Sequence, residues 1–226
     1  MSALSIDSER DRLAREAYLQ LSAAADEFER YVHPHAARIS AIADRIAETL
    51  HMAPQDRRSL RNAARMHDLG EVAMERDYIQ RAGPLTAEER IDLARHPVIG
   101  EQEAARASAD RAIQLLVRWH HEWWNGSGYP DALGQTEIPL GARILRVADS
   151  YAAMTDNRPY RNAMTEDQAR EQIIEGAGIE FDPDVVTVLL SLQDVEELRS
   201  YARDELLPAT ETASENDSIL FSSFSR

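Results

Sequence analysis

The chain has 226 residues, enough for one substantial domain or at most two small ones, and its 43% hydrophobic and 29% charged residues are ordinary for a soluble globular protein. No apolar run approaches the roughly 18–20 residues of a membrane span, and the first residues lack the apolar core of a secretory signal. The formal net charge of −15 is spread along the chain and disfavours binding to long nucleic acid, whose phosphates need clustered basic residues.

The dominant hydrophobic period is helical. Apolar residues at three- to four-residue spacing predict an amphipathic first helix between Leu13 and Phe28. A second helix follows, and its apolar stripe begins one turn after His35 with Ile39. The segment SLRNAARMHDLG predicts a third helix that carries His67 on its buried face, with Gly70 as a natural C-terminal stop.

Capping signals mark the next helices. Thr86 and Glu89 form a capping box that opens a helix running toward His96. Asp110 precedes a helix that ends near His120. The stretch WNGSGYPDALGQTEIP is a loop, because its glycines and prolines leave no room for a long helix. Helices return at about residues 140 (carrying Asp149), 165–175 and 183–203.

These elements predict an all-α fold with few or no strands. We expect an N-terminal segment at 1–12, one helical domain at 13–205 and a flexible, Ser- and Thr-rich tail at 206–226, whose few apolar residues could instead dock on the domain or on a partner. The first helix could mediate a homodimer or pack on its own core. We expect a cytoplasmic protein that does not bind membranes.

The histidines carry the chemical signal. The chain has no cysteine, so any metal ion must be held by imidazole and carboxylate. One histidine on an apolar helical face is usually a hydrogen-bonded core residue, but six of the seven histidines lie at or beside a buried stripe. A shared metal cluster would satisfy all of these imidazoles together. Neighbouring side chains on a helix point about 100° apart, so in the pair His67–Asp68 the histidine can bind one metal ion while the carboxylate bridges to a second.

These residues resemble a known family. His35, the pair His67–Asp68 and Asp149 resemble the H…HD…D signature of the HD phosphohydrolase superfamily. The segments HAARI, HDLG, HHEWWNGSGYP, IPLGARILRVAD, RPYR and FDPDVV, in this order, resemble the HD-GYP subfamily of bacterial phosphodiesterases that degrade cyclic di-GMP. The match runs from about Leu13 to Leu192. It implies a helical HD-domain bundle with a Gly- and Pro-rich GYP loop.

The resemblance also implies roles for individual residues. Two metal ions are expected, Fe or Mn, with Zn or Ni also compatible with the ligands. Asp68 would be the catalytic carboxylate that, with a water or hydroxide, bridges the two ions, and this hydroxide would attack phosphorus in line. Arg158 and Arg161 would bind the substrate phosphates, unless they form surface ion pairs, and Tyr129 would shape the loop beside the substrate. The expected ligands are His35, His67, Asp68 and Asp149 for one ion, and Asp68, His96, His120 and His121 for the other.

The chain departs from the family at four positions. Glu71 stands where the family usually has a lysine that contacts substrate phosphate, and none of the 25 basic residues is lysine. Ala152 replaces an aspartate, Asn125 replaces the usual aspartate of the loop, and Tyr31 stands where some members place a glutamate ligand of a third metal ion. Glu71 has three interpretations: a solvated residue at a helix end, a replacement that weakens catalysis, or an extra metal ligand.

Three functions follow as hypotheses. The first is a phosphodiesterase that opens cyclic di-GMP to linear pGpG and onward to GMP. The second is a catalytically weak or inactive domain that binds a cyclic dinucleotide or a signalling partner of the diguanylate-cyclase type. The third is a phosphohydrolase that acts on another nucleotide.

Overall fold

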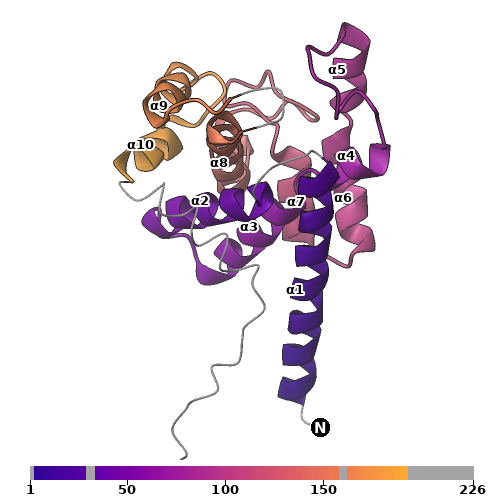
Figure 1. Ribbon diagram of the computed structural model, residues 1–226. Coiled ribbons are helices and arrows are strands. Elements are labelled where there is room, and N and C mark those ends of the chain that lie inside the picture. The colour runs from indigo at the N-terminus through magenta and orange to yellow at the C-terminus, as the bar shows by residue number, and fades with distance from the viewer. Residues whose placement is uncertain (1–2, 29–33, 158–161, 193–226) are drawn as a thin grey trace, which may run out of the picture.

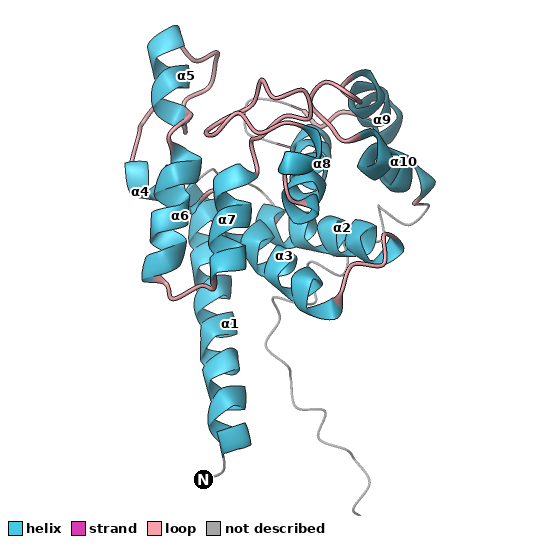
Figure 2. Cartoon of the chain, turned by 180° about the vertical axis from the view of Figure 1, so that it is seen from behind, coloured by secondary structure: helices cyan, strands magenta, loops and turns pink. Residues whose placement is uncertain are grey.

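The computed structural model describes residues 3–28, 34–157 and 162–192, and every regular element in these ranges is helical, which confirms the all-α prediction (Figure 1; Figure 2). An isolated β-bridge joins Ala177 and Phe181. The helices are α1 Ala3–Phe28, α2 His35–Thr49, α3 Pro54–Met66, α4 Leu69–Met74, α5 Ala87–Leu93, α6 His96–Arg106, α7 Arg111–Trp119, α8 Leu140–Thr155, α9 Glu166–Glu175 and α10 Pro183–Ser191, with a short 3-10 helix at Gln135–Glu137.

Helices α2, α3 and α8 form the centre of the molecule. The predicted stripe of α2 is fully buried at Ile39, Ile42 and Ile46, and it shares one hydrophobic core with residues of the neighbouring α8 such as Leu145 and Tyr151. Complete burial of one large aliphatic side chain contributes about 1.5–3 kcal/mol. Helices α6 and α7 extend this core beside α3, α4 packs on α6, and α9 and α10 cover the far side of α8. The core therefore holds the ends of α2, α3, α6 and α7 around α8.

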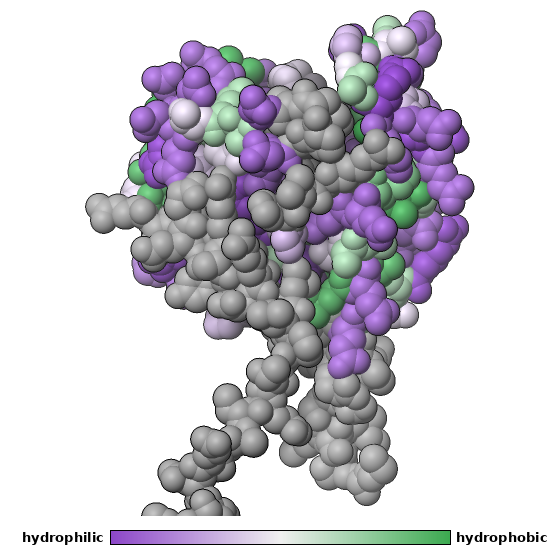
Figure 3. Space-filling view, viewed as in Figure 1, coloured by the Kyte–Doolittle hydropathy of each residue, from purple (hydrophilic) through white to green (hydrophobic). Residues whose placement is uncertain are grey.

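Two elements lie at the periphery. Helix α1 begins at Ala3 rather than near Leu13 and projects away from the bundle, and its second half packs through Tyr18 and Ala25 (Figure 1). Helix α5 buries none of its residues and stands beyond α4. No helix in the described ranges combines the length and apolar character that a membrane span requires. Figure 3 shows hydrophilic side chains over most of the described surface on this side, interrupted by small hydrophobic patches.

The helix starts agree with the capping signals, but one predicted stop is wrong. The predicted caps Thr86 and Asp110 each accept a hydrogen bond from the backbone N–H three residues later, as N-cap residues do, and Thr165 does the same at the start of α9. The third helix, however, ends at Met66, and Gly70 lies inside the next helix, α4, without a positive φ. A methyl group at Gly70 would stand 2.0 Å from the backbone oxygen of His96. Glycine is required there because α4 and α6 approach closely.

The C-terminal prediction extends past the described residues. Helix α10 starts at Pro183 as expected and reaches Ser191. The remainder of the predicted helix to residue 203 and the predicted tail at 206–226 lie outside the described residues.

Candidate metal centre

The seven predicted ligands lie together, most of them at or beside the ends of helices. His35 and His96 are the first residues of α2 and α6, whereas His67 and His120 follow the last residues of α3 and α7. Asp149 lies inside α8. The ligand atoms form two groups, in each of which all atoms lie within 4.8 Å of one another: His35, His67 and Asp149, and Asp68, His96, His120 and His121.

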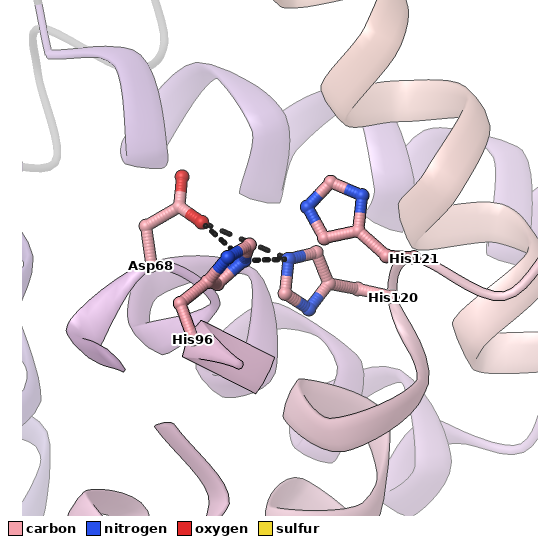
Figure 4. Close-up of side chains that lie close together, drawn as sticks. All are labelled: Asp68, His96, His120 and His121. Carbon is pink, nitrogen blue, oxygen red and sulfur yellow. Dashed lines mark hydrogen bonds and ion pairs between the residues drawn. The ribbon is translucent and has the colours of Figure 1, made fainter. Parts of the chain in front are cut away.

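Asp68 lies between the two groups. Its Oδ2 is 2.8 Å from Nε2 of His67. Its Oδ1 is 3.4 Å from Nε2 of His96 and 3.7 Å from Nε2 of His120 (Figure 4). In the first group, Oδ1 of Asp149 is 3.9 Å from Nε2 of both His35 and His67. One carboxylate thus faces both groups with different oxygens, the arrangement by which a carboxylate bridges two cations.

The hydrogen bonds of the rings direct Nε2 toward the centre. Nδ1 of His67, His96 and His120 donates to the carbonyl oxygen three residues earlier, at 2.8, 2.8 and 2.6 Å. Since a carbonyl oxygen only accepts, Nδ1 carries the proton and a neutral ring presents a bare Nε2. Nε2 of His96 and Nε2 of His120 are only 3.2 Å apart. Two such lone pairs need a cation or a proton between them, so these residues fit a metal ion.

The electrostatics of the cluster favour the same ligands. Burial lowers the pKa of His96 to about 4, which keeps this ring neutral and able to bind a metal ion at neutral pH. Burial alone raises the pKa of Asp68, but the charge of the neighbouring His67 holds it well below its usual range. Burial also lowers the pKa of His67, yet the negative charges of Asp68 and Asp149 raise it to about 10. In the absence of a metal ion, this proton is the positive charge that balances the two carboxylates.

Arg146 is a residue of the site that sequence reasoning missed. Its Nη1 donates to Nδ1 of His121 at 3.0 Å and lies 3.5 Å from Oδ2 of Asp149, while Nη2 pairs with Glu180. The guanidinium group therefore contacts one ligand from each group. The available signal was a basic residue one helical turn before an expected acidic ligand, Asp149.

Glu71 is buried, so its interpretation as a solvated residue at a helix end is wrong. It lies in the first turn of α4 with 9% of its surface exposed, and its Oε1 is 4.0 Å from Nδ1 of His96. Burial and the nearby charges of Asp68 and Asp149 raise its pKa well above the usual range. The other two interpretations of Glu71 stay open.

The loop between α7 and α8 is held by carboxylates. Buried Glu122 accepts hydrogen bonds from the backbone N–H groups of Asp131 at 2.7 Å and Leu133 at 3.0 Å. Asp131 in turn accepts from Arg118 and from the indole of Trp119. The loop presents Tyr129, whose ring stacks on His121 with 4.8 Å between ring centres. Tyr129 therefore lies beside the cluster.

A cavity of about 330 Å³ opens onto the cluster. Asp68, Glu71, His121 and Asp149 are among the residues that line it. The segment between α4 and α5 also lines it, through Tyr78, Ile79, Arg81 and Leu85. The predicted phosphate ligands Arg158 and Arg161, and the position of Tyr31, lie outside the described residues.

Comparisons with known proteins agree with this architecture. A family profile described as "HD domain" matches residues 20–185. The chain is 40% identical over 156 residues to the cyclic di-GMP phosphodiesterase response regulator RpfG of Xanthomonas campestris, covering 68% of this chain and 41% of RpfG. It is 34% identical over 164 residues to a cyclic di-GMP phosphodiesterase of Thermotoga maritima, which covers 71% of this chain and 44% of that protein. It is 30% identical over 184 residues to the 3'3'-cGAMP-specific phosphodiesterase 2 of Vibrio cholerae, which covers 80% of this chain and 35% of that protein.

Solved structures share the fold. The V-cGAP3 phosphodiesterase of Vibrio cholerae matches with a TM-score of 0.65 at 20% identity, covering 83% of this chain and 50% of that one. Bd1817, an HD-GYP-type protein of Bdellovibrio bacteriovorus, matches with a TM-score of 0.57 at 19% identity, covering 69% of this chain and 50% of that one. The chain belongs to the HD domain family, in agreement with the motifs. It spans less than half the length of these curated relatives.

Proposed function

We propose that this chain is a metal-dependent phosphodiesterase that opens cyclic di-GMP to linear pGpG and onward to GMP. The observation that carries the proposal is the double cluster, in which Asp68 turns one oxygen toward each group of ligands. Relatives named as cyclic dinucleotide phosphodiesterases support the substrate class.

The donor set supports two metal ions, Fe or Mn, with Zn or Ni also compatible. Such a pair, when bound, supplies an acidified water as nucleophile and polarises the phosphate oxygens. The chain's own contribution is to hold five imidazoles and two carboxylates in place before substrate arrives. Anchored Nδ1 atoms direct Nε2 inward at His67, His96 and His120, so binding needs no reorientation of these rings.

The cavity supports a ligand that is only partly enclosed. Its volume of about 330 Å³ lies near the lower end of the roughly 300–1,000 Å³ range of small-molecule pockets. A ligand with two nucleotides would place its scissile phosphodiester over the cluster and leave its other half outside. We assign phosphate binding to Arg158 and Arg161, and contact beside His121 to Tyr129.

One observation favours a second function, a weak or inactive domain that binds the nucleotide or a signalling partner. Glu71 places a buried carboxyl group on the cavity wall, close to Asp68. This carboxyl group offers no positive charge to a substrate phosphate and repels it when ionised, whereas a lysine would attract it.

A turnover assay with measured metal content separates these functions. Purified protein would be loaded anaerobically with Fe(II) or Mn(II), analysed for bound metal, and incubated with cyclic di-GMP, 3'3'-cGAMP and cyclic di-AMP before chromatography of the products. We expect pGpG and then GMP from cyclic di-GMP, and no product from an Asp68→Asn control. Nucleotide binding by calorimetry without turnover, at two metal ions per chain, would reject the enzyme and favour the binding domain. Turnover of 3'3'-cGAMP or cyclic di-AMP without turnover of cyclic di-GMP would reject cyclic di-GMP as the substrate and favour the other nucleotide.

A further inference from the structure

His35 is anchored differently from the other histidines whose Nδ1 donates a proton. His67, His96 and His120 each donate to a backbone carbonyl group of their own chain segment, three residues earlier. Nδ1 of His35 instead lies 2.7 Å from Oδ2 of Asp156, a residue 121 positions away. Asp156 is the C-cap residue of α8, the helix that also carries Asp149 of the same ligand group.

A second residue of α2 fixes the carboxylate of Asp156. Nη1 of Arg38, one turn after His35, donates to Oδ1 of Asp156 at 2.5 Å, and its Nη2 donates to Oγ1 of Thr155 at 2.8 Å. Each oxygen of Asp156 therefore has its own donor, and the carboxylate cannot rotate without breaking one bond. His35, Arg38, Thr155 and Asp156 are all buried.

This arrangement does more than join α2 to α8. The ion pair between Arg38 and Asp156 would by itself tie the two helices together. Buried ion pairs are costly in stability, and well-packed apolar residues often replace them without loss. The second oxygen of Asp156 determines which nitrogen of His35 carries the proton, and so leaves Nε2, 3.9 Å from Asp149, as the nitrogen that faces the cluster.

We propose that Asp156 is a positioning residue for metal binding: through the chain Arg38–Asp156–His35 it fixes the tautomer and orientation of His35 and makes that ring a better ligand. The inference rests on the proposed metal centre. Carboxylates that hold metal-binding histidines in this way typically change metal affinity 10- to 100-fold when they are lost.

The variant Asp156→Asn tests this proposal with almost no change of volume. The neutral amide can still accept a hydrogen bond from Arg38, but it no longer provides a negative charge to His35. We expect one of the two metal-binding steps for Mn(II) or Zn(II), measured by calorimetry or by competition with a chelating indicator, to weaken about 10- to 100-fold while the other stays unchanged.

Asp182→Asn is the matched control. Asp182 is also buried and also pairs with an arginine, Arg143, but it caps α10. The two variants lose the same kind of charge, so a purely structural role of Asp156 predicts similar losses of thermal stability and unchanged metal affinity in both.

A measurement on the unmodified protein covers the case in which Asp156→Asn does not fold. Long-range proton–nitrogen NMR correlations of metal-free protein report the tautomer of each neutral histidine ring. We expect the neutral His35 ring to carry its proton on Nδ1, and the opposite tautomer or a mixture would overturn the proposal. If the natural protein binds no metal ion, the proposed function fails; if it binds two and Asp156→Asn binds both equally well, only the role of Asp156 fails.

Discussion

Replacement of Gly70 by alanine probes the contact that sets the distance between Asp68 and His96. Gly70 lies in the first turn of α4, where a Cβ atom would stand 2.0 Å from the backbone oxygen of His96 and 2.8 Å from the backbone nitrogen of Gly100. Both obstacles are main-chain atoms of α6, so no side-chain rotation relieves them. To restore an ordinary contact of 3.4 Å, the two helices must separate by about 1.4 Å.

This separation has a cost in stability and in metal binding. Overpacking of this kind destabilises by typically 1–3 kcal/mol, and 1 kcal/mol lowers Tm by roughly 2–4 °C in a chain of this size. We therefore expect Gly70→Ala to lower Tm by about 2–12 °C. Movement of α6 also withdraws His96 from Asp68, 3.4 Å away, so metal binding by the second ligand group should weaken about tenfold or more.

Thermal unfolding followed by circular dichroism, with and without metal, measures the first effect, and metal titration measures the second. Gly134→Ala is the control, because its φ is −123° and the nearest atoms to an added Cβ are 3.6 Å away. The reasoning would be refuted if Gly70→Ala matched both the Tm and the metal affinity of Gly134→Ala.

The remaining predictions concern three carboxylates. Hydrogen bonds from Arg118 lower the pKa of Asp131 from 3.8 to about 2, so its stabilisation is complete above pH 4 and is lost as the pH falls through 2. The Tm difference between the natural protein and Asp131→Asn should therefore shrink between pH 5 and pH 2, and a constant difference would contradict this. Glu122→Ala leaves the backbone N–H groups of Asp131 and Leu133 unpaired, so it should cost about 1–3 kcal/mol per buried group in urea unfolding, and a loss below 0.5 kcal/mol would contradict the assignment. Glu71→Lys should raise kcat/KM for cyclic di-GMP if Glu71 weakens catalysis by disfavouring the substrate phosphate. An unchanged kcat/KM would show that Glu71 does not limit turnover.

Local signals accounted for most helix starts. N-cap residues such as Thr86, Asp110 and Thr165 accept hydrogen bonds from backbone groups three residues away, so a helix start can be predicted from a few neighbouring residues. The stop at Gly70 failed for the opposite reason. A glycine after an apolar run indicates a helix end, but this glycine is required by contact with α6, about thirty residues later in the chain.

In the candidate site, too, some features could be predicted from the sequence and others could not. The order of His35, the pair His67–Asp68 and Asp149 pointed to the cluster, because ligand chemistry and motif spacing are properties of the sequence. The burial of Glu71, the contacts of Arg146 with His121, and the bond from His35 to Asp156 could not be predicted. Each depends on where one helix meets another.

By itself, the sequence determined the helical class, the capped helix starts, the absence of thiolate ligands and the set of imidazoles and carboxylates available for a metal ion. Only the tertiary structure decided which oxygen of Asp68 faces which group of ligands, which ring nitrogens point inward, and which residues hold the rings in place. The physical reason is the range of the interactions. Periodicity and capping act over three or four residues, whereas the geometry of the cluster is set by packing between residues up to 121 positions apart.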